Sequence, residues 1–139
     1  MKVYLAVPLQ TNRNKSLSLT LHKIITKLGF EIVSDWVTWD DPNPNLNAHG
    51  VYQRDFNAIQ NSDILVAEVS LPSIGIGMEI MYAYTLGKPV VCISSDDKIS
   101  NMVKGLPNVI LIHYSDMSQL EKELRSKIKF AVASDLAKL

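Results

Sequence analysis

Residues 63–79 read DILVAEVSLPSIGIGME. They open with a short, β-branched apolar run at Ile64–Ala67, pass through a polar stretch with one proline, and end in a glycine-containing segment. Near-continuous apolarity over so few residues is typical of a strand buried on both faces of a parallel sheet. Gly77–Leu86 then has the apolar pattern of a helix, which Gly87-Lys88-Pro89 ends. This strand–loop–helix unit is the element from which doubly wound α/β folds are built.

The same alternation runs along the rest of the chain. Short apolar runs predict strands at Val3–Val7, Glu31–Val33, Val90–Ile93 and Val109–His113, and helical spacing predicts helices at Lys15–Leu28, Tyr52–Ile59 and Met117–Ile128. Right-handed crossovers between such strands require a parallel sheet with helices on both faces. We therefore predict a single α/β domain over residues 1–139, with a five-stranded, flavodoxin- or Rossmann-like sheet in the order 2-1-3-4-5. Residues 34–50 are predicted to form an exposed loop, and residues 131–139 a tail that extends the last helix or frays.

Composition narrows the class of protein. The 139 residues include 14 basic and 14 acidic side chains, so no global field attracts nucleic acid or an anionic membrane. The chain lacks an apolar run near the roughly 20 residues that a bilayer span needs, and its start does not resemble a signal peptide. A lone Cys92 in an apolar run is typical of a reducing compartment. We therefore expect a cytoplasmic domain that acts on a small molecule, with neither nucleic acid nor membrane as partner.

The predicted topology directs attention to one edge of the sheet. In such folds ligands bind at the carboxyl ends of the strands, where the strand order reverses, which here points to residues 8–11 and 68–79. Gly75 and Gly77 allow close approach of a ligand, and free amides at a helix start favour an anion. Glu79 is predicted in the first helical turn, kept ionised by the dipole, where it can attack a sugar carbon. An equally good interpretation is a phosphate-binding loop. In that case Glu79 does not react and is merely a favourable residue at the start of a helix.

Several motifs resemble one known family. Ser73–Glu79, followed by Ala83 and Leu86-Gly87-Lys88, looks like the nucleoside 2-deoxyribosyltransferase superfamily, which includes the 2'-deoxynucleoside 5'-phosphate N-hydrolases. Further matches are Val3-Tyr4, Arg54–Asn57, Asp63–Val69 and Ser100–Gly105, so that the resemblance covers residues 3–128. It implies that Glu79 attacks C1' of the sugar, that Asp55 helps the base to depart, and that Tyr4 holds the Glu79 carboxylate by a hydrogen bond. It implies no cofactor, and we see no His/Cys cluster typical of a metal site.

The resemblance also bears on the substrate. Ser73 stands where the base-exchanging transferases carry Asp and the nucleotide hydrolases carry Ser, and a hydroxyl suits a 5'-phosphate better than a carboxylate does. Ser100 matches a second hydrolase serine, which in that family is supplied across a dimer interface, and Met102 matches a residue lining the same pocket. Together with the amides of Gly75 and Gly77, these residues would form a phosphate site in a homodimer.

One stretch departs from the hydrolase pattern. The loop after the first strand carries Pro8 and Gln10 at the positions of a phosphate-binding Ser and Arg, with Arg13 or Lys15 as possible replacements for the charge. We expect hydrolysis of (2'-deoxy)nucleoside 5'-monophosphates to free base and sugar phosphate through a covalent glycosyl-Glu79 intermediate. The alternatives are a deoxyribosyltransferase that exchanges bases between nucleosides, and a nucleotide-binding module that cleaves nothing.

Three residues have open roles. Glu68, at a predicted strand end, is a second carboxylate near the site, for which we favour a structural role. Trp36 and Trp39 lie in the predicted loop, where they either stack on a nucleobase or pack the loop against the domain.

Overall fold

The computed structural model describes residues 1–10 and 13–136. Thr11, the last residue of the stretch predicted to approach a ligand, its neighbour Asn12, and residues 137–139 of the predicted tail lie outside the described part. The five strands are β1 (Lys2–Ala6), β2 (Glu31–Ile32), β3 (Ile64–Glu68), β4 (Val90–Ser94) and β5 (Ile110–His113). All pairs are parallel and the order is β2-β1-β3-β4-β5, which confirms the predicted topology.

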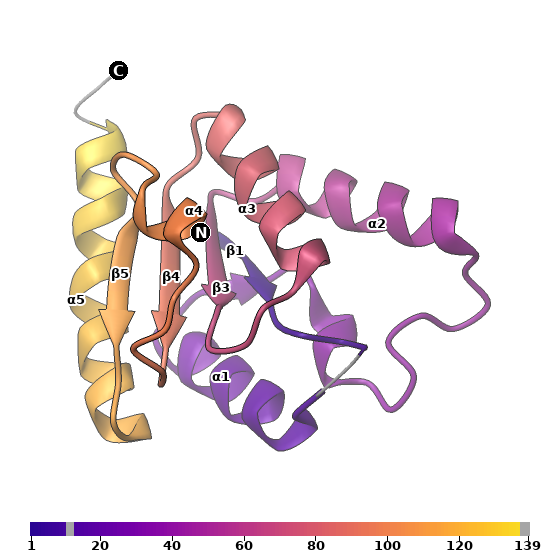
Figure 1. Cartoon of the computed structure of the whole chain (residues 1–139), viewed down its shortest axis with the longest axis horizontal. Helices are drawn as coiled ribbons and strands as arrows, with labels where there is room; N and C mark the ends of the chain where they lie inside the picture. Colours follow the sequence, from indigo (N-terminus) through magenta and orange to yellow (C-terminus); the bar gives the residue numbers. More distant parts are fainter. Residues whose placement is uncertain (11–12, 137–139) are drawn as a thin grey trace.

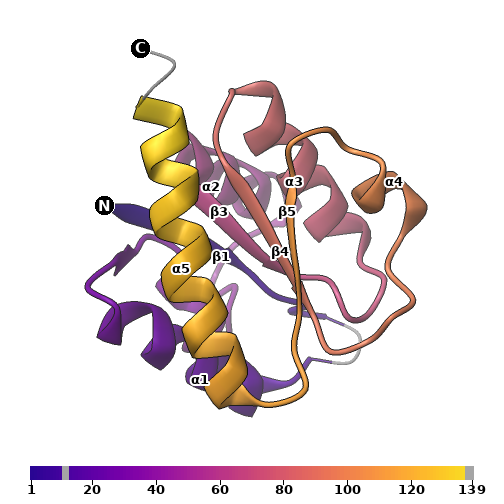
Figure 2. The ribbon, with the colours of Figure 1, turned by 90° about the vertical axis from the view of Figure 1, so that its left-hand side faces the viewer.

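Helices cover both faces of this sheet. They are α1 (Lys15–Lys27), α2 (Ala48–Gln60), α3 (Ile74–Thr85), the short α4 (Asn101–Lys104) and α5 (Met117–Leu136), with a 3-10 helix, η1 (Asp35–Thr38), after β2. Figure 1 shows α1 and α5 on one side of the sheet and α2 and α3 on the other, and the turned view in Figure 2 places α5 in front of the strands. None of the helices in the described ranges combines the length and apolarity that a bilayer crossing requires.

The central strands have the burial that their sequence predicts. Every residue of β3 and β4 is buried, which is what strands covered on both faces require. Their apolar side chains join those of β1 and the inward faces of α1 and α5 in one core, in which Leu5, Leu21 and Leu124 are completely buried. This core fixes the carboxyl ends of β1 and β3 and the starts of the helices that follow them.

Two helices begin earlier than the sequence predicted. The side chain of Asn47 accepts a hydrogen bond from Gly50 N at 2.8 Å and caps α2, so the last residues of the predicted 34–50 loop are helical. The Ser73 side chain accepts from Ile76 N at 3.3 Å and caps α3, which starts at Ile74 rather than at Gly77. Both errors have one cause: apolar periodicity locates the buried part of a helix, whereas the cap residue sets its first turn.

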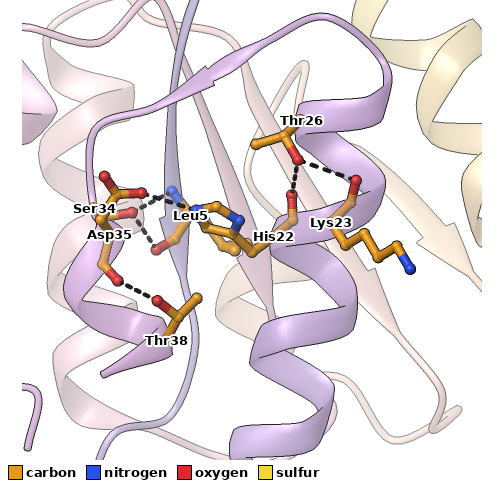
Figure 3. A network of polar contacts seen from close by, with 7 residues as sticks. All are labelled: Leu5, His22, Lys23, Thr26, Ser34, Asp35 and Thr38. Carbon is orange, nitrogen blue, oxygen red and sulfur yellow. Dashed lines mark hydrogen bonds and ion pairs between the residues drawn. The ribbon is translucent and has the colours of Figure 1, made fainter. Parts of the chain in front are cut away.

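A buried serine joins the segment after β2 to β1. Ser34 Oγ accepts from Leu5 N and donates to the Leu5 carbonyl, each at 2.9 Å, just beyond the point where β2 ends (Figure 3). Asp35 follows with its carboxylate 2.8 Å from His22 Nε2 of α1. These contacts set the position of η1 beside β1, and thereby of Trp36.

Ser34→Ala is expected to lower the free energy of unfolding by about 2 kcal/mol, because two buried backbone groups of Leu5 lose their partner. Urea unfolding followed by circular dichroism measures the loss. Ser16→Ala, at an exposed position of α1, is the matched control and should change stability by less than about 0.5 kcal/mol. A Ser34→Ala effect no larger than that of the control would contradict the role assigned to this hydroxyl.

Candidate active site

Three polar side chains from separate elements meet beside the carboxyl end of β1. Tyr4, on β1, is 2% exposed and donates its phenolic hydrogen bond to Glu79 Oε1 of α3 at 2.8 Å. Asp55, on α2, is also buried, and a hydrogen bond and the charge of its carboxyl both act on Glu79. The structure therefore brings together the three residues that the sequence singled out for the reaction.

Glu79 differs from its predicted environment. It is the sixth residue of α3 and so lies in the second turn, because the helix begins at Ile74. Glu79 is half-buried as a whole residue, and burial of its carboxyl raises the pKa of that group from 4.5 to about 8; the hydrogen bond from Tyr4 and the charge of Arg54 oppose the rise, whereas Asp55 adds to it. The prediction that the helix dipole keeps this carboxyl ionised is wrong, since desolvation of the charged form outweighs the dipole.

The pKa values of Asp55 and Tyr4 are raised as well. Burial raises the pKa of Asp55, with the hydrogen bond and the charge of Arg54 acting against it. Burial raises the pKa of Tyr4 far above its usual value, so its hydroxyl stays a donor to Glu79. The two carboxyls thus form a coupled pair that holds a proton more readily than either would in water.

A cavity of about 600 Å³ lies on the α4 side of α3. It is lined by four of the residues predicted to bind substrate, Ser73, Gly77, Ser100 and Met102. Ser100 Oγ accepts from Met102 N at 3.2 Å and caps α4, as Ser73 caps α3, which leaves both hydroxyl protons available to a ligand. Gly75 is exposed in the first turn of α3, and a side chain there would meet open space.

Glu79 is not among the residues that line this cavity. Gly77 and Glu79 are two positions apart on α3, and side chains at that spacing point to different sides of a helix. The predicted reacting residues therefore lie on the α2 side of α3, and the predicted phosphate-binding residues on its α4 side. Lys98, which the sequence analysis did not single out, also lines the cavity and brings a positive charge to it.

The stretch after β1 lies apart from that cavity. Pro8 lines a second cavity of about 340 Å³ together with Glu68 and Ser70, and Gln10 is exposed. Glu68 is buried and accepts a hydrogen bond from Ser70 N at 2.9 Å, which agrees with the structural role favoured for it. Both predicted replacements for the missing phosphate cation have protein partners: Arg13 donates to the Asp40 carbonyl at 2.9 Å, and Lys15 pairs with the Asp40 carboxylate.

The two tryptophans have different environments. Trp36, 7% exposed, packs edge to face against Tyr4 with the ring centroids 6.2 Å apart, so it belongs to the wall behind the carboxyl pair. Trp39 is 45% exposed. Within the described residues, no group of three or more His, Cys, Asp or Glu side chains is arranged to hold a metal ion.

Known proteins resemble this chain over nearly its whole length. A family model described as nucleoside 2-deoxyribosyltransferase matches residues 3–127. A Thermofilum pendens protein named "Putative 2'-deoxynucleoside 5'-phosphate N-hydrolase 1" is 32% identical over 140 residues, which cover 95% of this chain and 98% of that protein. The rat 5-hydroxymethyl-dUMP N-hydrolase is 40% identical over 58 residues, or 40% of this chain and 36% of that protein.

A solved structure shares the fold. The Clostridium botulinum CMP N-glycosidase BcmB superposes with a TM-score of 0.70 at 21% identity, covering 89% of this chain and 98% of that one. Identity this low supports the fold alone.

Proposed function

Because this chain belongs to the nucleoside 2-deoxyribosyltransferase family, we propose that it hydrolyses the N-glycosidic bond of (2'-deoxy)nucleoside 5'-monophosphates. The relatives are N-hydrolases and deoxyribosyltransferases, so the chain is an enzyme of this kind rather than a module that only binds. The observation that carries the assignment is the Glu79 carboxyl held by Tyr4 at 2.8 Å with the Asp55 carboxyl beside it. A buried carboxyl pair next to a sugar is the usual apparatus of glycosidic cleavage.

A single proton shared by the two carboxyls makes one of them an acid and leaves the other ionised as a nucleophile. When the proton resides on Asp55, Glu79 is ionised and attacks C1' of the sugar as the bond from C1' to the base nitrogen breaks. The bonding electrons leave with the base, which takes the proton of Asp55. The oxocarbenium-like transition state is stabilised by the adjacent carboxylate, and the product is a glycosyl ester of Glu79.

Water completes the reaction. Asp55, now ionised, removes a proton from a water molecule that attacks C1', and the bond from C1' to the Glu79 oxygen breaks. The Glu79 carboxylate and the proton on Asp55 are restored, and the sugar 5-phosphate leaves. Tyr4 donates to Glu79 throughout, which favours the ionised carboxylate both before attack and after release.

The nucleotide preference rests on the residues around the start of α3. We assign the 5'-phosphate to the hydroxyl of Ser73 and the exposed backbone of Gly75 and Gly77, joined by the Ser100 hydroxyl of a second copy of the chain, where charge-assisted hydrogen bonds favour a dianion. The cavity on the α4 side of α3 is also lined by Lys98, which brings a cation to it, and by Met102. Pro8 and Gln10 add neither a hydroxyl nor a charge.

A second candidate is the base-exchanging transferase, in which another base takes the place of water. It is favoured by the chemistry after β1: Pro8 and Gln10 replace a hydroxyl and a cation, and Arg13 and Lys15 are engaged with Asp40. A free nucleoside needs no such groups.

A homodimer is part of the proposal. Ile74, Met81 and Met102, which line the cavity, are 47–88% exposed although they are apolar. A second copy would cover them, with Ser100 completing the neighbouring site. Activity per chain should then fall on dilution below the dissociation constant of the dimer.

A substrate panel tests the function. Deoxy- and ribonucleoside 5'-monophosphates and the matching nucleosides are incubated with the protein, and free base is measured by chromatography. Release from monophosphates alone supports the hydrolase. Exchange into an added second base, with nucleosides as the better substrates, would support the transferase, and no release from any substrate would overturn both.

A further inference from the structure

Arg54 is the cation nearest the carboxyl pair, and its side chain is held on several sides. On α2 it directly precedes Asp55, and its Nε donates to Asp55 Oδ1 at 2.8 Å. Its other two nitrogens donate to the carbonyl of Pro42 at 2.6 Å and to Asn43 Oδ1 at 2.9 Å. Adjacent residues on a helix do not normally face each other, so the Asp55 carboxyl is turned toward its neighbour by this contact.

The flat face of the guanidinium is occupied as well. Its central carbon lies 4.0 Å from the centroid of the Trp36 ring, and Trp36 in turn packs against Tyr4, which donates to Glu79. Hydrogen bonds in the plane and an aromatic ring below it define both the position and the orientation of the group. The side chain is 19% exposed, so solvent has limited access to these contacts.

We propose that Arg54 is a positioning residue of the reaction: it aims the Asp55 carboxyl toward the leaving base and fastens the segment of residues 36–43 beside the carboxyl pair. This inference rests on the proposed function. A residue that only fastened a loop would need the bonds to Pro42 and Asn43, whereas Arg54 also uses its Nε on Asp55. Lysine could not replace it, because one ammonium cannot hold three acceptors in a plane and stack on a ring.

The charge of Arg54 has a separate consequence. It lowers the pKa values of Asp55, Glu79 and Tyr4 against the effect of burial. Loss of this cation therefore raises the pH at which Glu79 ionises.

The acidic side chains of residues 35–41, next to Arg54, have partners of their own. Asp35 lies against His22, Asp40 pairs with Lys15, and Asp41 accepts from the backbone of Asn43. These carboxylates therefore do not compete with Asp55, with which Arg54 pairs.

The test compares Arg54→Gln, Arg54→Lys and Asn43→Ala, with Arg125→Gln as the matched control on an exposed part of α5. Kinetics of base release give kcat and KM across pH, and carbon-13 NMR of the side-chain carboxyls gives the pKa of Glu79 without any need for turnover. Arg54→Gln should lower kcat about 10- to 100-fold with KM changed less than about threefold, because a misaimed acid slows chemistry more than binding. In Arg54→Gln, the acid limb of the pH–rate profile and the pKa of Glu79 should both shift to higher pH.

The remaining variants separate position from charge. Arg54→Lys should keep the pKa of Glu79 near that of the wild type, yet its kcat should be less than about a tenth of the wild-type value. Asn43→Ala should leave the pKa of Glu79 unchanged. Added guanidinium ion at non-denaturing concentration should partly restore Arg54→Ala, which a misfolded chain could not show.

Three results would overturn the proposal. They are an Arg54→Gln kcat within about twofold of Arg125→Gln, an unchanged Glu79 pKa, or an Asn43→Ala variant identical to Arg54→Gln in every measurement. If wild type releases no base from any nucleotide, the proposed function fails instead, and the NMR titration still decides whether Arg54 acts on the pair.

Discussion

Glu79→Gln is expected to reduce base release by on the order of 10³-fold or more, because an amide cannot form the glycosyl ester. Binding of the substrate should persist, since the amide has the shape of the carboxyl and its oxygen still accepts from Tyr4. The measurement is single-turnover release of base, with calorimetry or a fluorescent nucleotide for binding. Glu31→Gln, an identical chemical change at the exposed amino end of β2, is the control and should leave turnover unchanged.

The covalent step has its own test. A 2-fluoro substituent on the sugar slows formation and breakdown of an oxocarbenium-like state. A fluorinated nucleotide with a good leaving group should therefore label the wild type, and mass spectrometry should find the sugar on Glu79. Turnover in Glu79→Gln at the wild-type rate, or a label on another residue, would remove Glu79 from the mechanism.

Glu79→Gln should also raise the stability of the folded protein at alkaline pH. The folded-state pKa of Glu79, about 8, exceeds its usual 4.5. Between these values the folded protein holds a proton that the unfolded chain has lost, so the contribution of Glu79 to stability is full below about pH 4.5 and falls as pH rises through 8. Gln carries no charge at any pH. Thermal unfolding should give a Tm for Glu79→Gln above that of wild type at pH 9 and close to it at pH 4.

Asp55→Asn is expected to lower kcat by about 10²- to 10⁴-fold, the usual contribution of a general acid. The loss should depend on the leaving group. A 4-nitrophenyl deoxyriboside phosphate, whose leaving group needs no proton, should lose much less than a nucleotide. Asp116→Asn is the control, because Asp116 caps α5 through Gln119 N and asparagine caps equally well.

The pH profile of Asp55→Asn gives a second readout. The charge of Asp55 raises the pKa of Glu79, so its removal should move the acid limb of kcat/KM to lower pH, opposite to the shift expected for Arg54→Gln. Equal losses for both classes of leaving group, or an acid limb that does not move, would contradict the role of Asp55.

The local sequence determined the elements and their order. Apolar runs of the right length located all five strands. The signal is strongest in β3 and β4, which are buried along their whole length and are apolar up to their last residue. Gly29 and Gly87, which follow α1 and α3, have φ values of 91° and 72°, as the predicted helix ends require. The starts of α2 and α3 were missed although Asn47 and Ser73 are ordinary cap residues. The first turn of α2 has no buried residue, and in that of α3 the buried Ile76 lies between Gly75 and Gly77, which interrupt the apolar pattern.

What the sequence by itself determined is the sheet order and, through family motifs, the choice of Tyr4, Asp55 and Glu79 as the candidate reacting residues. Tertiary structure alone decided that burial raises the pKa of Glu79 to about 8, that Arg54 and Trp36 lie beside the pair, and that Lys98 lines the cavity on the other side of α3. The physical reason is that apolar patterning is local, encoded in consecutive residues. Desolvation and charge depend on which side chains, distant in the chain, exclude water together.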